Sequence, residues 1–267
     1  PVETQKKVKP TPWMRMGTLV HHARLEPDVP LPRIVVRPPT YPAPADHEKV
    51  KEGTIPVGHP LKWFGGAGYC KRWEKAQAEA GLEVLPEEEW DTFGNCVEAL
   101  EQDEQCAAIF EDGLGEVSVF QEIRLPYSSA RLRRKMRLDW VRPEFRYIAD
   151  VKVVQKGMAK RENWETLAFD RRYIVQAPYY MDGWNSAVDE ENKVDRFIFV
   201  VVEREAPFLT AKFEIGINSQ EAAIGRSIYI QDLETLSECQ TTGNWPGYFP
   251  GIQAMGIPAY ARKKLNL

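Results

Sequence analysis

The sequence has no apolar run near the roughly 18–20 residues needed to cross a membrane, and no signal-peptide pattern opens the chain. It has only four cysteines and four histidines. The cysteine spacing fits neither a zinc site nor a compact disulfide framework, and the metalloprotease motif HExxH is absent. These absences argue against a membrane protein, a zinc protease and a disulfide-stapled domain. We expect a cytoplasmic protein with reduced, buried thiols.

A strong excess of positive charge is also missing, because 35 Lys and Arg residues are outnumbered by 39 Asp and Glu residues. Nucleic-acid binders often have a basic surface. The net charge of −4 therefore counts mildly against such a protein. The charge is nevertheless uneven, since "RLRRKMR" (131–137) contains five cations in seven residues. An acidic protein with one basic strand can bind a polyanion locally and repel it elsewhere.

The length of 267 residues allows one large domain or two small ones. We expect an N-terminal arm over residues 1–14 and a single domain over residues 15–267. The proline-rich segment 27–62 is predicted to be extended, and its role stays open.

The hydrophobic periodicity predicts alternating groups of helices and strands. Helices are predicted at 15–26, 70–81, 86–110, 162–187 and 218–240, and strands at 116–125, 130–141, 145–154, 195–205 and 210–216. The first three strands read as an antiparallel meander, and the C-terminal tail as irregular. This order indicates the α/β or α+β class, with a central mixed sheet flanked by helices.

One predicted strand, "FRYIADVKVV" (145–154), carries Asp150 and Lys152 among apolar residues. Side chains alternate along a strand, so both point to the same side of the sheet. Burying a carboxylate and an ammonium is costly unless they pair or bind something. They are therefore either a structural ion pair or part of a site.

Asp139, on the preceding predicted strand, favours a site. Two carboxylates meeting on adjacent strands suit an oxygen-preferring ion such as Mg²⁺. A neighbouring lysine can stabilise developing negative charge, and the combination suits phosphodiester hydrolysis. The candidate catalytic residues are Asp139, Asp150 and Lys152.

Two further groups of residues extend this candidate site. By alternation, Arg133, Lys135 and Arg137 share a side with Asp139, so a basic track could hold DNA phosphates without reading sequence. Gln176 and Tyr180 are four residues apart, on one face of the following helix. The role of four aromatic residues stays open: each either stacks on bases at a DNA end or serves core packing or a subunit contact. They are Trp13, Trp63, Phe64 and Trp140.

These motifs, in this order, resemble the PD-(D/E)xK nuclease superfamily, in its RecB-like branch with a QxxxY motif. More narrowly, they resemble the RecE-like phage and prophage exonucleases. "GTLVHHARLEPD" (17–28) is similar to the family's GTxxHxxxLEPE motif, and "YIVQAPYYMDG" (173–183) to its YxxQxAFYxDG motif. "RLDWVRPEFRYIADVK" (137–152) and "LSECQTTGNWPGY" (236–248) are similar to two further family segments.

The resemblance implies a restriction-endonuclease-like core and assigns roles to residues. It implies metal ligation by His21, Glu116, Asp139, Asp150 and the carbonyl of Val151. Lys152 would orient or activate the attacking water, and Gln176 and Tyr180 would act from the flanking helix. His22, next to His21, is not expected to take part.

The resemblance also implies an activity and partners. The expected activity is Mg²⁺-dependent digestion of linear double-stranded DNA from 5′ ends, with Mn²⁺ able to substitute, leaving 3′ tails for recombination. The expected assembly is a ring-shaped homo-oligomer, a trimer or tetramer, working with a single-strand annealing protein in the cytoplasm of a bacterial host. Two alternatives stay open: an endonuclease of the same superfamily and a non-catalytic DNA clamp.

Overall fold

A five-stranded mixed sheet lies at the centre of the structure, a computed structural model that describes residues 11–26, 29–247, 251–252 and 254–265. The strand order is β5 (Leu114–Arg124), β6 (Arg131–Arg142), β7 (Tyr147–Val154), β8 (Arg196–Glu203) and β9 (Thr210–Gly216). β7 and β8 run parallel, and the other neighbouring strands run antiparallel. The predicted meander and the mixed sheet are therefore confirmed.

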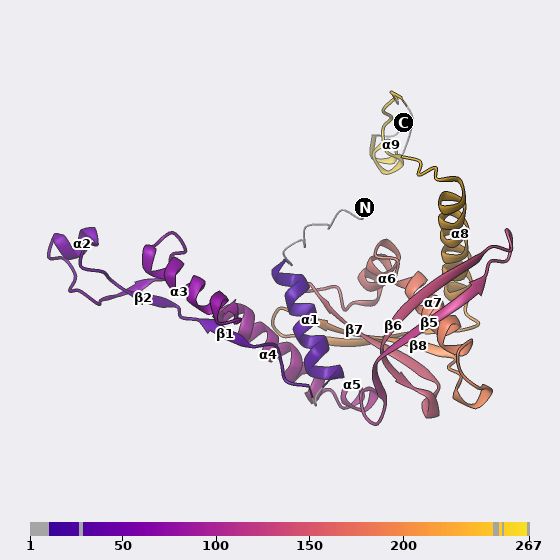
Figure 1. Ribbon diagram of the computed structural model, residues 1–267, viewed down its shortest axis with the longest axis horizontal. Coiled ribbons are helices and arrows are strands. Elements are labelled where there is room, and N and C mark those ends of the chain that lie inside the picture. The colour runs from indigo at the N-terminus through magenta and orange to yellow at the C-terminus, as the bar shows by residue number, and fades with distance from the viewer. Residues whose placement is uncertain (1–10, 27–28, 248–250, 253, 266–267) are drawn as a thin grey trace.

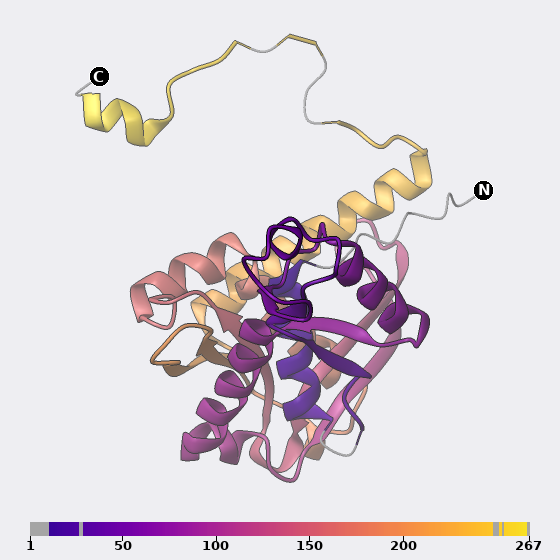
Figure 2. The same ribbon diagram turned by 90° about the vertical axis from the view of Figure 1, so that its left-hand side faces the viewer.

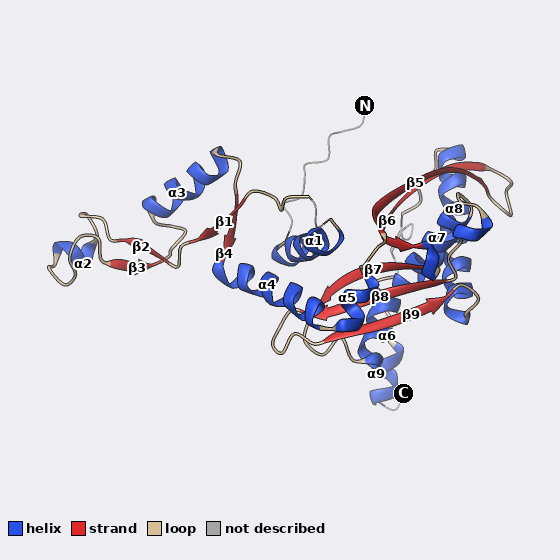
Figure 3. Ribbon diagram, turned by 90° about the horizontal axis from the view of Figure 1, so that it is seen from below, coloured by secondary structure: helices blue, strands red, loops and turns tan. Residues whose placement is uncertain are grey.

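Helices cover both faces of this sheet (Figure 3). On one face, α1 (Pro12–Leu25), α4 (Glu87–Gln102) and α5 (Glu104–Ile109) enclose a core that includes Ala149 and Val151 of β7. On the other face, α6 (Arg161–Asp170) and α7 (Tyr173–Asn185) pack over Ile148 and Phe199. Because β7 side chains alternate, Asp150 and Lys152 face α7.

The segment between α1 and α4 extends away from the sheet, to the left in Figure 1. It contains a parallel pair, β1 (Ile34–Arg37) with β4 (Glu83–Pro86), and an antiparallel pair, β2 (Thr40–Pro42) with β3 (Pro60–Lys62). Two helices, α2 (Glu48–Lys51) and α3 (Gly68–Glu79), complete it. The proline-rich stretch is thus extended, as predicted, but it also holds short strands and a helical turn. Leu85, at the base, joins the core under α1 and α4.

The helix predicted over 86–110 is two helices, because Asp103 interrupts it. The Asp103 side chain accepts hydrogen bonds from the backbone N–H groups of Gln105 and Cys106, which caps α5. Its second oxygen accepts from Thr210 and Lys212 of β9. A contact distant in sequence therefore sets this break.

The helix predicted over 162–187 is likewise divided, into α6 and α7. The break is at Arg172, whose φ of 60° lies in the left-handed region. Arg172 forms an ion pair with Asp232 of α8 (Gln220–Thr242), which packs on α7. As at Asp103, a partner distant in sequence sits at the interruption.

Both ends of the chain differ from expectation. α1 begins at Pro12, so part of the predicted arm is helical, while residues 1–10 lie outside the described residues. The tail predicted to be irregular contains α9 (Ala259–Leu265), which stands apart from the rest in Figures 1 and 2. All four cysteines are buried free thiols, as expected. No described helix combines the length and apolarity needed to cross a membrane.

The contact between α7 and α8 depends on a glycine. A Cβ atom on Gly225 would lie 1.9 Å from the backbone oxygen of Ile174. We therefore expect Gly225→Ala to force the helices apart and lower the free energy of unfolding by about 1–3 kcal/mol, measured by urea denaturation. Gly94→Ala on α4 is the control, because a Cβ there meets nothing within 4 Å. Equal stability of the Gly225 variant and the wild type would contradict this close packing.

Candidate nuclease site

The candidate site lies where β6 separates from β7. Their ladder has three residue pairs and ends with Trp140 opposite Ala149. One further step in this register would place Asp139 opposite Asp150. At that point, however, β6 stops pairing with β7 and stays paired with β5 alone. Figure 3 shows β5 and β6 curving away from β7, β8 and β9. The two carboxylates thus meet in a fork between strands.

Helix α1 places His21 in this fork. The Nε2 atom of His21 lies 2.6 Å from the carbonyl oxygen of Val151, and its Nδ1 atom lies 3.3 Å from Oδ2 of Asp139. Because a carbonyl can only accept, Nε2 carries a hydrogen and Nδ1 is the atom turned toward the carboxylates. One ligand atom each from His21, Asp139 and Asp150 lies within 4.8 Å of the others.

These donor atoms fit a divalent cation. Oδ2 of Asp139 is buried and accepts no hydrogen bond from any residue that the structure describes, and Oδ2 of Asp150 has the Lys152 ammonium beside it. Unsatisfied buried carboxylate oxygens are costly, and a cation is a natural partner for them. The set of two carboxylates, one imidazole and one carbonyl would suit Mg²⁺ or Mn²⁺. The residues present therefore fit the ion that the sequence implies.

Electrostatics also favour a cation between these carboxylates. Burial, and next the charge of Asp150, raise the pKa of Asp139 to about 9. Without a cation, burial and the neighbouring charge therefore favour a proton shared by the Asp139–Asp150 pair. A bound divalent ion would reverse this preference, because it stabilises the ionised form.

Lys152 and Gln176 fix the position of Asp150, whose side chain is only 2 % exposed. The Nζ atom of Lys152 lies 2.5 Å from Oδ2 of Asp150, and Nε2 of Gln176 donates to Oδ1 at 2.7 Å. The Lys152 ammonium also lies 4.8 Å from the centre of the Tyr173 ring. The Asp–Lys pair predicted as either structural or functional is thus an ion pair, with a second carboxylate beside it.

Helix α7 contributes one face to the site. Tyr173, Gln176 and Tyr180 follow the i, i+3, i+7 spacing of such a face. Burial, then the charges of Asp139 and Asp150, raise the pKa of Tyr180 to about 12. Its hydroxyl therefore keeps its proton and can donate near the fork. Sequence reasoning did not single out Tyr173, although its place three residues before Gln176 is a signal for it.

Glu116 lies at the edge of the site. The register on either side, Gly115 with Trp140 and Val117 with Leu138, places it opposite Asp139. Its φ of 55° interrupts the ladder there. Glu116 forms an ion pair with Arg137 and stands outside the three-residue cluster. Its predicted metal ligation stays a prediction.

The basic track runs along β6 toward the fork. The exposed face of β6 carries Arg133, Lys135 and Arg137, and alternation continues this series to Asp139, as predicted. Arg137 is tied to Glu116 and lies 3.9 Å from Glu26. The geometry places the track as expected, and its binding of DNA stays a prediction.

The remaining candidates are spread over the molecule. His22 bonds to Glu26 and to the carbonyl of Pro30, away from the carboxylates, in line with the choice of His21. Trp140 is core, at 7 % exposed. Trp63 packs on Tyr41 and Trp73 in the protruding segment. Trp13 is half-exposed beneath Arg204, and Phe64 is exposed at 65 %.

Comparisons with known proteins agree with this architecture. The crystal structure of a "Putative exonuclease" from Eubacterium rectale aligns with a TM-score of 0.53 and 11 % identity, over 97 % of this chain and 81 % of that chain. At this identity the likeness shows the fold alone. The crystal structure of SSO0001 aligns at a TM-score of 0.32 and 14 % identity, over 87 % of this chain and 88 % of that one, and supports no conclusion. No curated protein matches the chain.

A family model matches residues 2–255, and so includes every residue of the fork. Its description, "PDDEXK-like domain of unknown function (DUF3799)", agrees with a carboxylate on one strand and an Asp-x-Lys sequence on the next. By this match the chain belongs to the family of PDDEXK-like domains of unknown function.

Proposed function

We propose that this protein is a divalent-metal-dependent DNA nuclease and, more narrowly, a Mg²⁺-dependent exonuclease that degrades linear duplex DNA from 5′ ends. The observation that supports it most is the fork, where His21, Asp139 and Asp150 converge beside Lys152. The PDDEXK-like family supports phosphodiester hydrolysis. The sequence motifs and the name of the E. rectale protein favour an exonuclease.

Each residue of the fork has a role in this proposal. Asp139, Asp150, His21 and the Val151 carbonyl would hold the ion, with Glu116 at its edge. When bound, Mg²⁺ would polarise the phosphate and lower the pKa of water. Gln176 holds one oxygen of Asp150, so the other stays turned toward Lys152.

Lys152 acts as a hydrogen-bond donor, because an ammonium has no lone pair. It would orient the attacking water and stabilise the negative charge that develops on the phosphate. Tyr180 would donate a second hydrogen bond from α7. The phosphates of the substrate strand would bind to Arg133, Lys135 and Arg137. These contacts would not depend on the DNA sequence.

The finer parts of the proposal rest on the resemblance to RecE-like exonucleases. The product would be duplex DNA with 3′ single-stranded tails, used in recombination by strand annealing. A ring-shaped trimer or tetramer would hold the DNA, and an annealing protein would receive the tail. The setting would be the bacterial cytoplasm, with the gene carried by a phage or prophage.

End-labelled DNA tests the proposal. We expect Mg²⁺-dependent nucleotide release from linear duplexes, with the 5′ label released before the 3′ label and closed circles left intact. Mn²⁺ should support the same reaction, and EDTA should stop it. Cut circles would indicate an endonuclease. DNA binding without hydrolysis in either metal would indicate a non-catalytic clamp.

A further inference from the structure

The outward face of the β5–β6 hairpin carries an aromatic side chain beside its cations. Phe120 of β5 is 75 % exposed, and the register places it opposite Lys135 of β6. Glu122 lies opposite Arg133 on the same face. A single exposed phenylalanine is common on protein surfaces. What distinguishes this one is the cations that surround it and the site to which they lead.

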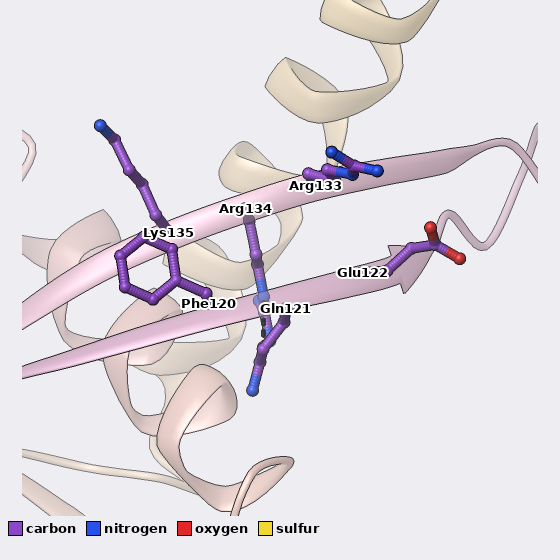
Figure 4. Close-up of a pocket in the computed structure, with 6 residues that line it drawn as sticks. All are labelled: Phe120, Gln121, Glu122, Arg133, Arg134 and Lys135. Carbon is purple, nitrogen blue, oxygen red and sulfur yellow. Dashed lines mark hydrogen bonds between the residues drawn. The ribbon is translucent and has the colours of Figure 1, made fainter.

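A cavity of about 450 Å³ opens at this position, lined by Phe120, Gln121, Glu122, Arg133, Arg134 and Lys135. In Figure 4, Phe120 lies beside the base of Lys135, while Arg134 and Gln121 point together to the other side. Arg134 bonds to Gln121 and to Ser186 near the end of α7, so these two residues hold the hairpin in place. Phe120 and Lys135 are left to meet a ligand.

The charges around the ring favour a phosphate-bearing ligand. Glu122 is paired with Arg131 at 2.8 Å, which offsets its negative charge. Within the described part of the chain, Arg133 and Lys135 form no ion pair. Two cations therefore flank an apolar ring on the surface that leads to Asp139.

We propose that Phe120 stacks on an unpaired base of the DNA strand whose phosphates follow Arg133, Lys135 and Arg137. This inference rests on the proposed nuclease function. A base projects sideways from its phosphate, and β5 lies beside β6 at about 4.8 Å, so a strand bound along β6 presents its bases over β5. Aromatic stacking accepts any base, which suits a nuclease without sequence preference. Only an unpaired base offers a free face, so Phe120 engages the strand after the duplex opens.

The register sets how far this base lies from the reacting phosphate. Lys135 precedes Asp139 by four residues, or about 13 Å along a strand. In B-form DNA, about four nucleotides of one strand span this distance. An extended single strand covers the same distance with fewer nucleotides. The stacked base therefore lies within about four nucleotides of the cleaved bond.

The test is DNA binding in Ca²⁺, with a duplex that carries a single-stranded tail. We expect Phe120→Ala to bind roughly 5- to 150-fold more weakly than the wild type and Phe120→Trp to restore binding. One abasic site is then placed in turn at each of the last few nucleotides. At one of these positions, the abasic site should weaken binding by the wild type about as much as Phe120→Ala does. The same abasic site should not weaken binding by Phe120→Ala any further, because both changes remove the same contact.

Phe169→Ala is the matched control, because Phe169 is 62 % exposed on α6, away from the hairpin, and should leave binding unchanged. If every abasic site weakens the wild type and Phe120→Ala equally, the stacking inference is wrong. The nuclease proposal still stands in that case if the wild type cuts DNA in Mg²⁺. If Phe120→Ala also has a lower mass in sedimentation, and its effect adds to that of every abasic site, Phe120 belongs to a subunit contact. This outcome would also overturn the stacking inference. A wild type that neither binds nor cuts DNA would overturn both proposals.

Discussion

Replacement of Lys152 with alanine should lower the single-turnover rate of DNA hydrolysis by about 100- to 1000-fold. The reason is its position: the ammonium is 17 % exposed, lies 2.5 Å from Asp150 and is the donor nearest the paired carboxylates. Binding of duplex DNA in Ca²⁺ should stay within about threefold of the wild type, because the proposed phosphate contacts are on β6 and not at Lys152. Rate and binding measured on the same preparations separate the two effects.

Lys160→Ala is the control for this experiment, since Lys160 is an exposed lysine just before α6. It should hydrolyse DNA at the wild-type rate. Thermal melting of the Lys152 variant establishes that it is folded. A folded Lys152→Ala protein with wild-type hydrolysis would show that the Asp150–Lys152 pair is structural only.

Asp139→Asn should abolish metal-dependent hydrolysis and make the metal-free protein more stable at alkaline pH. The pKa of Asp139 is about 9 in the folded chain, above the ordinary value of 3.8. A raised carboxyl pKa contributes stability below the unfolded pKa, and this stability is lost as the pH rises toward the folded pKa. Between those values the free energy of unfolding falls by at most about 1.4 kcal/mol per pH unit from this group.

The measurement is the melting temperature in EDTA from about pH 6 to pH 8.5, as a difference between variant and wild type. This difference should grow with pH in favour of Asp139→Asn. Added Mn²⁺ should raise the melting temperature of the wild type and have little effect on the variant. Asp46→Asn, on the exposed part of the protruding segment, should match the wild type throughout. A constant difference across this pH range would show that Asp139 ionises normally.

The strands and the order of site residues could be predicted because they are local patterns. Alternation along 130–141 identified the basic track, and the Asp-x-Lys spacing put Asp150 and Lys152 on one face. Alternation also places Phe120 on the polar face of β5, between Ser118 and Glu122, which is a signal that sequence reasoning passed over.

The helix breaks and the fork could not be predicted in the same way. Asp103 ends a helix because Thr210 and Lys212 bind it, and they lie more than a hundred residues away. The parallel pairing of β1 with β4 likewise joins segments 49 residues apart (34 and 83). The fork exists because the β6–β7 ladder ends at Trp140 and does not reach Asp139. The residue pattern of one strand cannot predict where its pairing with a neighbour ends.

The buried, unpartnered oxygen of Asp139 also bears on how such a protein evolves. A pair of buried carboxyl groups without a cation is expected to cost stability, and under the proposed function selection for activity would oppose its loss. If selection for DNA cleavage were relaxed, Asp139 would be among the first residues to drift, because its replacement stabilises the empty fold. Family members that keep the fold but lack this aspartate would then be descendants that retain DNA binding or assembly without cleavage.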